Sequence, residues 1–285
     1  MTYNSNQIAE IIGVNVSTIK RWTDSGKLEC QQTIGGHRKF HLNHLRKFLK
    51  ENQKLSLNIN LKHLIGDNKS LINAIDKKDT NSLVDYCYKD LILSNSHRFT
   101  SLNNSLILKG YPIEKIFDDI VIPSLKIIGE KWANSELSIT EEHLATEKVR
   151  KFLLNLNLDT APESPKLNAY CFTLKNDKHD LPLYMGESIF NQNNIESINL
   201  GSNLPVNDFI SLSNKTSPDI IFISLIYVQD VNEINKEINL LCKTFLGSST
   251  KIFIRGFGFE QTSINYSNFI QVNSFESLKN QISKL

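Results

Sequence analysis

The sequence predicts a chain of three parts: a small helix-turn-helix part followed by a hairpin (residues 1–52), an α-helical bundle (residues 55–158) and a doubly wound α/β part with a parallel sheet (residues 167–285). Two short helical patterns joined by a tight turn precede two adjacent glycines near the N-terminus. Apolar residues then recur three and four positions apart, which is the spacing of amphipathic helices. Beyond residue 166, strand-like and helix-like stretches alternate, as in a parallel sheet with helices on both faces.

The composition is that of an ordinary globular protein, with 40% hydrophobic and 22% charged residues. No apolar run approaches the roughly 20 residues of a membrane span, and the polar N-terminal segment lacks the apolar stretch of a signal peptide. We therefore expect a cytoplasmic protein that does not enter a membrane. The cysteines are far apart and form no C-x-x-C pair, which predicts reduced structural thiols and neither a zinc site nor a disulfide framework: Cys30, Cys87, Cys171 and Cys242.

The net charge is divided unevenly along the chain. Residues 1–51 hold eight Lys or Arg and four acids, so that this segment carries +4 while the remainder carries −2. A small basic part on a mildly acidic body is the electrostatic pattern of a nucleic-acid binder, because cations displace the counterions condensed on phosphates. A surplus of this size is also common on solvated surfaces, so it is weak support by itself.

The first helical pattern, SNQIAEIIG, has Ser5 as a candidate N-cap and ends at Gly13. The second pattern, VSTIKRWTDSGKL, has Ser17 as a candidate N-cap and ends at Gly26. Two short helices joined by a tight glycine-containing turn predict a helix-turn-helix unit.

In the second helix, Ile19 and Trp22 stand three positions apart and predict its buried side. The polar residues between them fall on other faces, toward solvent or a groove: Thr18, Lys20 and Arg21.

After this helix, LECQQT and RKFH flank the sequence IGGH (residues 34–37). The two glycines permit the positive φ angles of a tight hairpin, and a hairpin that follows a helix-turn-helix is a wing. On these residues the segment resembles the MerR-type winged-helix family of DNA-binding regulators. The matching stretches are STIKRW (17–22), GKL (26–28) and TIGGHRKF (33–40).

This resemblance implies that the partner is a double-stranded DNA operator. We expect Lys20, Arg21, Arg38 and Lys39 to contact mostly phosphates, and Thr18 and Lys20 to reach bases. His37 is expected to be a wing residue and not a metal ligand. The candidate DNA-binding residues are Ser17, Thr18, Lys20, Arg21, Trp22, Gly35, Gly36, His37, Arg38 and Lys39.

Residues 55–158 predict at least four helices with short connections, which is typical of a bundle. Thr140 is the candidate N-cap of the last helix, and Pro112 and Pro123 fall near breaks. The clearest apolar periodicity is in LINAI, SLVDYCYKDLIL, IEKIFDDIVIPSLKIIGEKW and EHLATEKVRKFLLNL. A linker, NLDTAPESPK (157–166), then marks a boundary by its two prolines and polar residues.

The α/β part predicts strands in LNAYCFTL, IESINL, DIIFISLIY, KIFIRGF and NFIQV, separated by helices. Ligands of parallel sheets lie at the carboxyl ends of the strands, so the loops after Leu174, Leu200, Ser224 and Arg255 are expected to line a site.

The first of these loops contains Asp177 and His179 in a D-x-H spacing. A carboxylate two residues before a histidine can accept a hydrogen bond from one ring nitrogen, which fixes the tautomer and directs the other nitrogen toward a metal. A lone surface histidine has no such role in most proteins. Later loops offer Ser224 and the small residues Gly256 and Gly258, which would let a bulky ligand approach the backbone.

Together these loops resemble the Rossmann-like cobalamin-binding (vitamin B12) domain, whose motif is D-x-H-x-x-G with a later S-x-L and a glycine pair. The resemblance implies that His179 is the lower axial cobalt ligand and that the nucleotide tail enters between sheet and helix. The sequence departs from the motif at Pro182, Ile226 and Phe257. The cofactor residues implied in this part are Asp177, His179, Gly201, Ser224, Gly256 and Gly258.

In the helical part, Trp132 precedes Glu142 and His143 with the W-x9-E-H spacing, which is similar to the helical caps of cobalamin-dependent light-sensing regulators. An indole can cover an apolar corrin face, and Glu and His can hydrogen-bond a deoxyadenosyl group. Light-responsive relatives can carry a histidine directly after the Trp, where this chain has Ala133. Without the D-x-H part downstream, these residues would predict only a core Trp and a helix start.

The resemblances predict a cytoplasmic transcription regulator, acting as a repressor, whose oligomeric state or DNA affinity depends on adenosylcobalamin and light. A homo-oligomer, dimer or tetramer, is expected. No paired catalytic carboxylates, nucleophile elbow or P-loop are present in the sequence, so we expect a non-enzyme. Two alternatives stay open: a cofactor-free sensor controlled by a partner protein, and a corrinoid carrier subunit of a methyltransferase.

Overall fold

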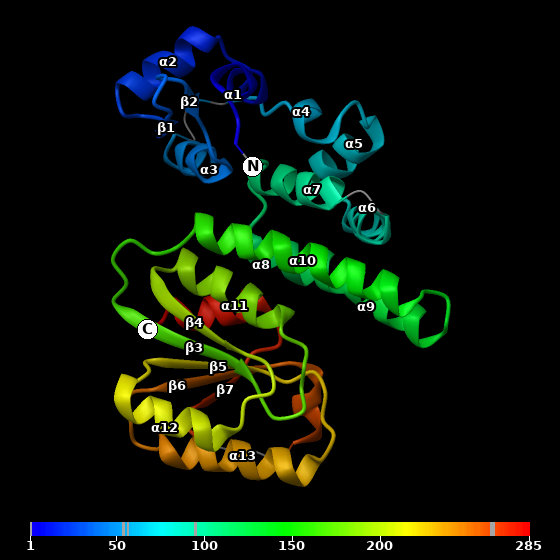
Figure 1. The fold of residues 1–285 in the computed structure, drawn as a ribbon, viewed down its shortest axis with the longest axis vertical. Helices are drawn as coiled ribbons and strands as arrows, with labels where there is room; N and C mark the ends of the chain where they lie inside the picture. Colours follow the sequence, from blue (N-terminus) through cyan, green and yellow to red (C-terminus); the bar gives the residue numbers. More distant parts are fainter. Residues whose placement is uncertain (1, 53–54, 56, 94–95, 263–265) are drawn as a thin grey trace. The chain divides into compact units, whose positions relative to one another are not determined.

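The computed structural model describes residues 2–52, 55, 57–93, 96–262 and 266–285 (Figure 1). The chain divides into two compact units, Met1–Lys148 and Val149–Leu285, and the division falls inside helix α10 (Ile139–Asp159). Within the described residues, no helix combines the length and the apolar character that crossing a bilayer requires. The three-part boundaries at residues 52, 158 and 167 stay predictions.

The first unit begins with helices α1 (Ser5–Ile12) and α2 (Val16–Asp24). The N-cap of α1 is Asn4 and not Ser5, because the Asn4 side chain accepts from the Gln7 amide while the Gln7 side chain accepts from the Asn4 amide. Gly13 ends this helix in the left-handed conformation, with φ 75°. The expected cap Ser17 lies inside α2, whose N-cap is Asn15, without a side-chain cap hydrogen bond.

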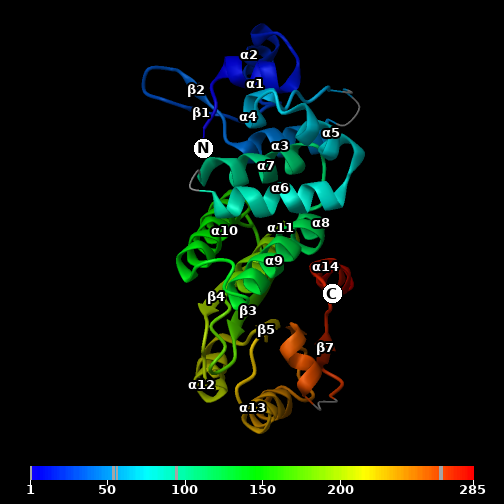
Figure 2. The same cartoon turned by 90° about the vertical axis from the view of Figure 1, so that its right-hand side faces the viewer.

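A two-stranded antiparallel hairpin follows, made of β1 (Gln31–Gln32) and β2 (Arg38–Lys39), and it projects from the helices of the same unit (Figure 2). Gly36 supplies the positive φ angle of the turn, 76°, and its amide donates to the Thr33 carbonyl. Helix α3 (Leu42–Glu51) then closes a small core with α1 and α2. Its buried members include Ile8, Ile11, Ile12, Ile19, Leu28, Phe40, Leu45 and Phe48.

The rest of the first unit is helical, as the periodicity predicts. Its helices are α4 (Lys62–Ile65), α5 (Lys69–Lys77), α6 (Thr80–Ile92), α7 (Ser96–Leu108), α8 (Ile113–Ile116), the π-helical turn η2 (Phe117–Val121), α9 (Ile122–Ala133) and the first half of α10.

One sequence expectation in this region needs correction. Ser138 and Glu141 cap the start of α10 reciprocally, so Thr140 is a residue of the helix and not its cap. Pro112 lies at a break, as the N-cap of α8, and Pro123 lies in the first turn of α9, close to its junction with the π-helical turn η2.

A buried lysine joins α10 to the end of α6. The Nζ of Lys148, whose side chain is 6% exposed, donates to the carbonyls of Asp90 (3.1 Å), Leu91 (2.6 Å) and Leu93. The last carbonyls of a helix have no partner within the helix, and a cation there also opposes the negative end of the helix dipole. Lys148 therefore acts as a side-chain cap supplied by another helix.

The second unit contains a five-stranded sheet in the order β4-β3-β5-β6-β7, with all its neighbours parallel. The strands are β3 (Leu167–Thr173), β4 (Ile195–Gly201), β5 (Ile220–Ser224), β6 (Lys251–Arg255) and β7 (Phe269–Gln271). The helices between them are α11 (Leu181–Gln192), α12 (Val206–Thr216), α13 (Val231–Thr244), the short 3-10 turn η3 (Phe257–Gln261) and α14 (Phe275–Ile282).

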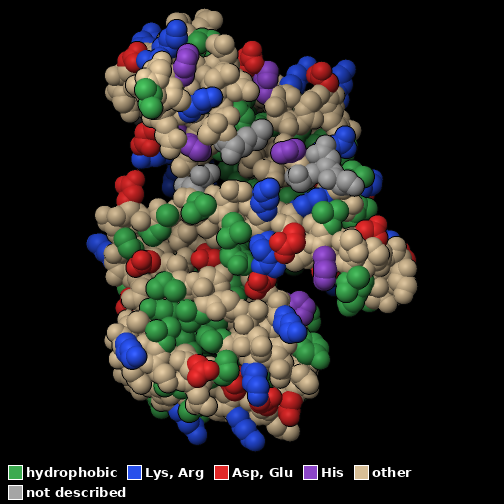
Figure 3. Space-filling view, viewed as in Figure 1, with side chains coloured by type: hydrophobic (Ala, Val, Ile, Leu, Met, Phe, Trp, Pro, Cys, Tyr) green, Lys and Arg blue, Asp and Glu red, His purple; other side chains and the backbone are tan. Residues whose placement is uncertain are grey.

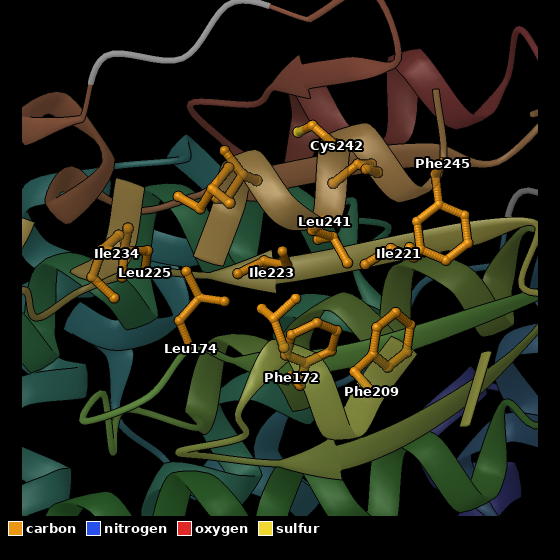
Figure 4. Packing of buried hydrophobic residues seen from close by; sticks show 14 of the residues in the cluster. Phe172, Leu174, Phe209, Ile221, Ile223, Leu225, Ile234, Leu241, Cys242 and Phe245 are labelled. Atoms are coloured by element: carbon orange, nitrogen blue, oxygen red, sulfur yellow. The ribbon is translucent and has the colours of Figure 1, made fainter. Parts of the chain in front are cut away.

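Helices cover both faces of this sheet, α12 and α13 on one side and α11 and α14 on the other (Figure 1). On the first side, alternate residues of the central strands, such as Ile221 and Ile223 of β5, pack with Phe209 and Leu241 of the helices (Figure 4). On the second side, Phe222 lies between Phe190 and Phe275, with ring centroids 5.8 and 6.5 Å away.

The linker is shorter than predicted, because α10 continues through Asn157 to Asp159 before the chain leaves the helix. Within the second unit, Asn157 donates to the Tyr184 carbonyl of α11 and also bonds the Ser188 hydroxyl. These hydrogen bonds attach the last turn of α10 to α11. The polar composition of the segment predicted a linker there and not a packed helix.

The Lys148 cap gives a stability prediction. Replacing Lys148 with Met keeps the length of the side chain but leaves the carbonyls at the end of α6 without their donor. We expect the free energy of unfolding to fall by about 1–3 kcal/mol. The measurement is urea denaturation followed by circular dichroism.

Lys126→Met is the matched control, since the Lys126 side chain is 76% exposed and pairs only at the surface with Glu130. A K148M protein as stable as the K126M protein would contradict the capping role.

Candidate functional site

The second helix of the first unit presents a polar face. Ser17, Lys20 and Arg21 are exposed on α2, Thr18 is half-buried, and Ile19 is fully buried in the core. Trp22 packs its ring against Phe48, with centroids 4.7 Å apart, which favours a packing role over contact with DNA. The remaining face is free to enter a groove, as the second helix of a helix-turn-helix does.

The wing contributes a second basic surface. His37 and Lys39 are exposed, and the face of this region shown in Figure 3 carries several Lys and Arg side chains. Arg38 was expected to contact phosphates. In the structure its guanidinium pairs with Asp24 at the end of α2, 2.5 Å away, and its side chain is 20% exposed. Arg38 thus holds the wing to the helix, while Lys39 remains open to a phosphate.

A polar hollow of about 430 Å³ lies between the wing and the start of α1. Arg38 and Lys39 line it from the wing, and Asn4, Ser5 and Asn6 line it from the helix. Gly35 and Gly36 shape the nearby turn, and Ile34 at its tip is fully exposed, so the hairpin end carries an apolar side chain into solvent.

The W-x9-E-H residues lie at one end of the helical hairpin formed by α9 and α10. Trp132, in the last turn of α9, is 47% exposed, and Ala133 follows it. Glu142 accepts from the Nδ1 of His143 at 2.7 Å and from the Thr146 hydroxyl at 2.8 Å. A half-exposed indole and an oriented Glu-His pair fit a surface that covers a flat apolar group and hydrogen-bonds a polar one.

The D-x-H loop of the second unit is built around a buried carboxylate. Asp177 is 0% exposed, and its Oδ1 accepts from the amide of His179 at 3.0 Å and lies 2.7 Å from the His179 Nδ1. Its Oδ2 accepts from the amides of Ile226 at 2.6 Å and Tyr227 at 3.3 Å. The hydrogen bond expected from the spacing is therefore present, and the 57% exposed side chain of His179 has its Nε2 directed away from Asp177.

Asparagines in left-handed conformations complete this loop. Asn176 (φ 69°) donates its amide to the Asn203 side chain at 2.7 Å, and Asn203 (φ 60°) donates its own amide to the Thr173 hydroxyl. The Asp177 carbonyl accepts from the Asn203 amide at 3.1 Å. Sequence reasoning missed Asn176 and Asn203; the tolerance of Asn for positive φ in loops is the signal that could have found them.

Ser224 ends the central strand β5, in register with Thr173 of β3 and Arg255 of β6. Its side chain is fully buried, and its hydroxyl has no hydrogen-bond partner among the described residues. Because side chains alternate along a strand, Ser224 faces the same side as Phe222, toward α11 and α14. An unpartnered buried hydroxyl is costly, so this atom marks a place where a polar group of a ligand would be stabilising.

The glycine pair has a different neighbour from the one expected. A Cβ on Gly256, whose φ is 122°, would lie 2.1 Å from the Leu225 carbonyl oxygen, and one on Gly258 would lie 2.9 Å from the same atom. The Gly258 amide donates to that oxygen at 3.1 Å. These glycines admit the backbone of the chain itself, and their expected contact with a ligand stays a prediction.

The other motif positions are placed as follows. Gly201 is the last residue of β4, with φ 83° and open space where a Cβ would be. Pro182 stands in the first turn of α11 and offers no N–H there, while Ile226 supplies its amide to Asp177. Phe257, between the glycines, is 63% exposed.

Within the described residues, no group of three or more His, Cys, Asp or Glu gathers as a metal cage. The candidate cobalt site is therefore one histidine with its carboxylate.

Comparison with known proteins finds two family models that match the chain, both largely within the first unit. A family model described as a helix-turn-helix domain matches residues 2–53, and one described as a B12 binding domain matches residues 89–156. The HTH-type transcriptional repressor CarH of Myxococcus xanthus is 23% identical over 238 residues, covering 79% of this chain and 79% of the relative.

Among solved structures, the monomethylamine corrinoid protein of Methanosarcina barkeri is similar in fold, with a TM-score of 0.57 and 14% identity. The matched region covers 72% of this chain and 99% of the corrinoid protein. A cobalamin-binding protein from Desulfitobacterium hafniense is less similar, with a TM-score of 0.35 and 12% identity.

The helical part and the five-stranded α/β part therefore have a cobalamin-binding fold. The chain carries a helix-turn-helix DNA-binding domain and a B12-binding domain, and it is distantly homologous to the CarH repressor over most of its length.

Proposed function

We propose that this regulator is a repressor whose oligomeric state or operator affinity is controlled by adenosylcobalamin and by light. The observation that carries the proposal is the hydrogen bond between the buried Asp177 carboxylate and the exposed His179 ring, at the carboxyl ends of the strands. A carboxylate partner makes an imidazole a stronger metal ligand and fixes its orientation.

Several described residues support this cofactor. His179, oriented by Asp177, would be a ligand to cobalt, and the unpartnered Ser224 hydroxyl would hydrogen-bond the nucleotide tail. Trp132 would pack on the corrin, and Glu142 and His143 would hydrogen-bond the adenosyl group. When bound, adenosylcobalamin supplies a cobalt–carbon bond that light can break.

Regulation follows from a shift between populations. Contacts of Trp132, Glu142 and His143 with the adenosyl group would favour one arrangement of the domains, and loss of these contacts would favour another. We propose that the first arrangement assembles a dimer or tetramer, in which several wings bind one operator with an avidity that a single copy lacks. Because Ala133 replaces the histidine of light-responsive relatives, this residue supplies no new ligand to cobalt after illumination.

One observation favours the cofactor-free alternative. The Leu225 carbonyl occupies the space where side chains at Gly256 and Gly258 would lie. On the face of the sheet that Ser224 shares, the neighbouring space is filled by Phe222, which packs between Phe190 and Phe275. In that alternative a partner protein controls the DNA reader, by which we mean the helix-turn-helix, the wing and helix α3 (residues 2–52). The carrier-subunit alternative gains support from the corrinoid protein of similar fold, but a methyl carrier has no use for a helix-turn-helix domain, so we regard the chain as a non-enzyme.

The cofactor is tested by purifying the protein with adenosylcobalamin in the dark. We expect the chromophore to co-elute, its absorbance spectrum to change on illumination, and His179→Ala to weaken binding at least about tenfold. His63→Ala is the control, since His63 pairs with Glu10 at the surface of the other unit. Absence of a bound chromophore would favour the cofactor-free alternative.

Ser224→Ala separates cofactor binding from folding. Removing an unpartnered buried hydroxyl should raise the stability of the protein without cofactor by about 1 kcal/mol, because no desolvated polar group remains. The same change should weaken adenosylcobalamin binding. Thermal unfolding with and without the cofactor measures both effects, and a loss of stability in the cofactor-free protein would contradict this placement of Ser224.

DNA binding is tested with Arg21→Ala and Lys39→Ala, which remove exposed cations of α2 and the wing. Each should reduce the salt dependence of DNA affinity by about one phosphate contact and weaken binding to all sequences. Lys126→Ala, on α9, is the control. Fluorescence anisotropy over a range of salt concentrations gives the slopes; slopes that match the control in both variants would refute the assignment of this surface.

A further inference from the structure

The first unit contains a cavity that neither the DNA reader nor the cobalamin site uses. It has a volume of about 500 Å³ and lies among α4, α5, α6 and α7. This is within the range of cavities that hold small molecules.

The cavity is apolar on one side and polar on the other. Leu64, Ile65 and Leu71 line it from α4 and α5, and Leu93 lines it from the end of α6. The Tyr86 hydroxyl is engaged with Ser70 at 2.7 Å, so it contributes its ring more than its hydrogen-bonding capacity. A ligand with an apolar body matches this surface.

The polar side is dominated by cations. Lys89 is neutralised by Asp85 at 2.6 Å, whereas the exposed Arg98 guanidinium makes no hydrogen bond to any described residue. Asp90 also lines the cavity, but it is only 8% exposed. Burial raises the pKa of its carboxyl group, and the charges of Arg98 and Lys148 partly oppose that rise. A guanidinium offers a planar fork of donors that matches a carboxylate, so Arg98 is suited to the head group of an anion.

Two walls of the cavity also belong to the DNA reader. Leu64 of α4 lines the cavity and packs against the core formed by α1, α2 and α3. Helix α7 carries Arg98 and Ser101 at its start, and its last residue, Leu108, is buried in that same core. A molecule bound here would therefore touch two helices on which the position of the reader depends.

We propose that this cavity binds an amphipathic carboxylate, with its apolar body against Leu64, Ile65, Leu71 and Leu93 and its head group on Arg98. Its occupancy biases the packing of α4 and α7 and thereby changes DNA affinity, a step that rests on the proposed regulatory function. The ligand is a second effector, distinct from cobalamin.

The binding step is tested by calorimetric titration of the full chain with decanoate, decan-1-ol and decylamine. These probes share their apolar body and differ in the charge of the head group. We expect decanoate to bind at least about tenfold more tightly than the alcohol, which lacks the charge-assisted hydrogen bonds. Equal binding of the three probes, tighter binding of the amine, or no binding of decanoate would overturn the proposal.

Two variants locate the site. Arg98→Met removes the charge from an exposed position and should weaken decanoate binding about tenfold, while Ser101→Phe should fill the cavity and abolish binding. Lys126→Met, a charge removed elsewhere in the same unit, should bind decanoate as the unchanged protein does. Wild-type decanoate affinity in both cavity variants would overturn the location.

The coupling step is read from DNA anisotropy with and without decanoate. We expect the DNA affinity to change severalfold in the unchanged protein and to stay constant in the Arg98→Met variant. A constant affinity in both proteins would overturn the coupling. If the chain bound no DNA at all, the proposed function would fail, yet the calorimetric titration would still decide whether the cavity binds the carboxylate.

Discussion

The buried carboxylate of Asp177 determines the architecture of the α/β part where its strands end. A fully buried carboxylate is tolerable only when hydrogen-bond donors surround it, and here the donors are the amide and ring of His179 and the amides of Ile226 and Tyr227. These donors belong to the loops that follow β3 and β5, so one acidic side chain fixes two loops relative to each other. Through its carbonyl, Asp177 also holds Asn203 of the loop after β4.

Backbone contacts join the start of the loop after β6 to this group. The Leu225 amide donates to the Arg255 carbonyl at 2.8 Å, and the Leu225 carbonyl lies so close to Gly256 that no side chain fits there. The four loops at this edge thus form one hydrogen-bonded assembly before any ligand arrives. Preorganisation of this kind lowers the entropy lost on binding, and it presents the His179 ring in one orientation.

The fold was largely predictable, because the spacing of apolar residues along the sequence shows which side of each helix or strand is buried. The alternation of strands and helices predicts the parallel sheet, and the three-and-four spacing predicts the helices, since each pattern follows from which side of an element is buried. Helix ends were harder to predict, because several polar residues compete at each start: Asn4 rather than Ser5 caps α1, and Ser138 rather than Thr140 caps α10. The choice depends on local geometry that composition does not record.

The candidate site was predictable where its partners are close in sequence and unpredictable where they are distant. Asp177 and His179 are two residues apart, so their hydrogen bond follows from spacing. The contact of Asp177 with Ile226, and the use of Gly256 by Leu225, depend on how separate strands align. The orphaned hydroxyl of Ser224 likewise emerges only from burial in three dimensions.

The pair between Arg38 and Asp24 has a consequence for how this wing discriminates among polyanions. Asp24 acts as an internal counterion, so a phosphate that engages Arg38 exchanges one anion for another and releases little from solution. Encounters with arbitrary DNA then gain less from this residue than from Lys39 or Arg21. In the proposed complex with DNA, Arg38 would contribute fully only where the shape of the duplex brings a phosphate near enough to outcompete the carboxylate, so that it would sense backbone geometry more than charge.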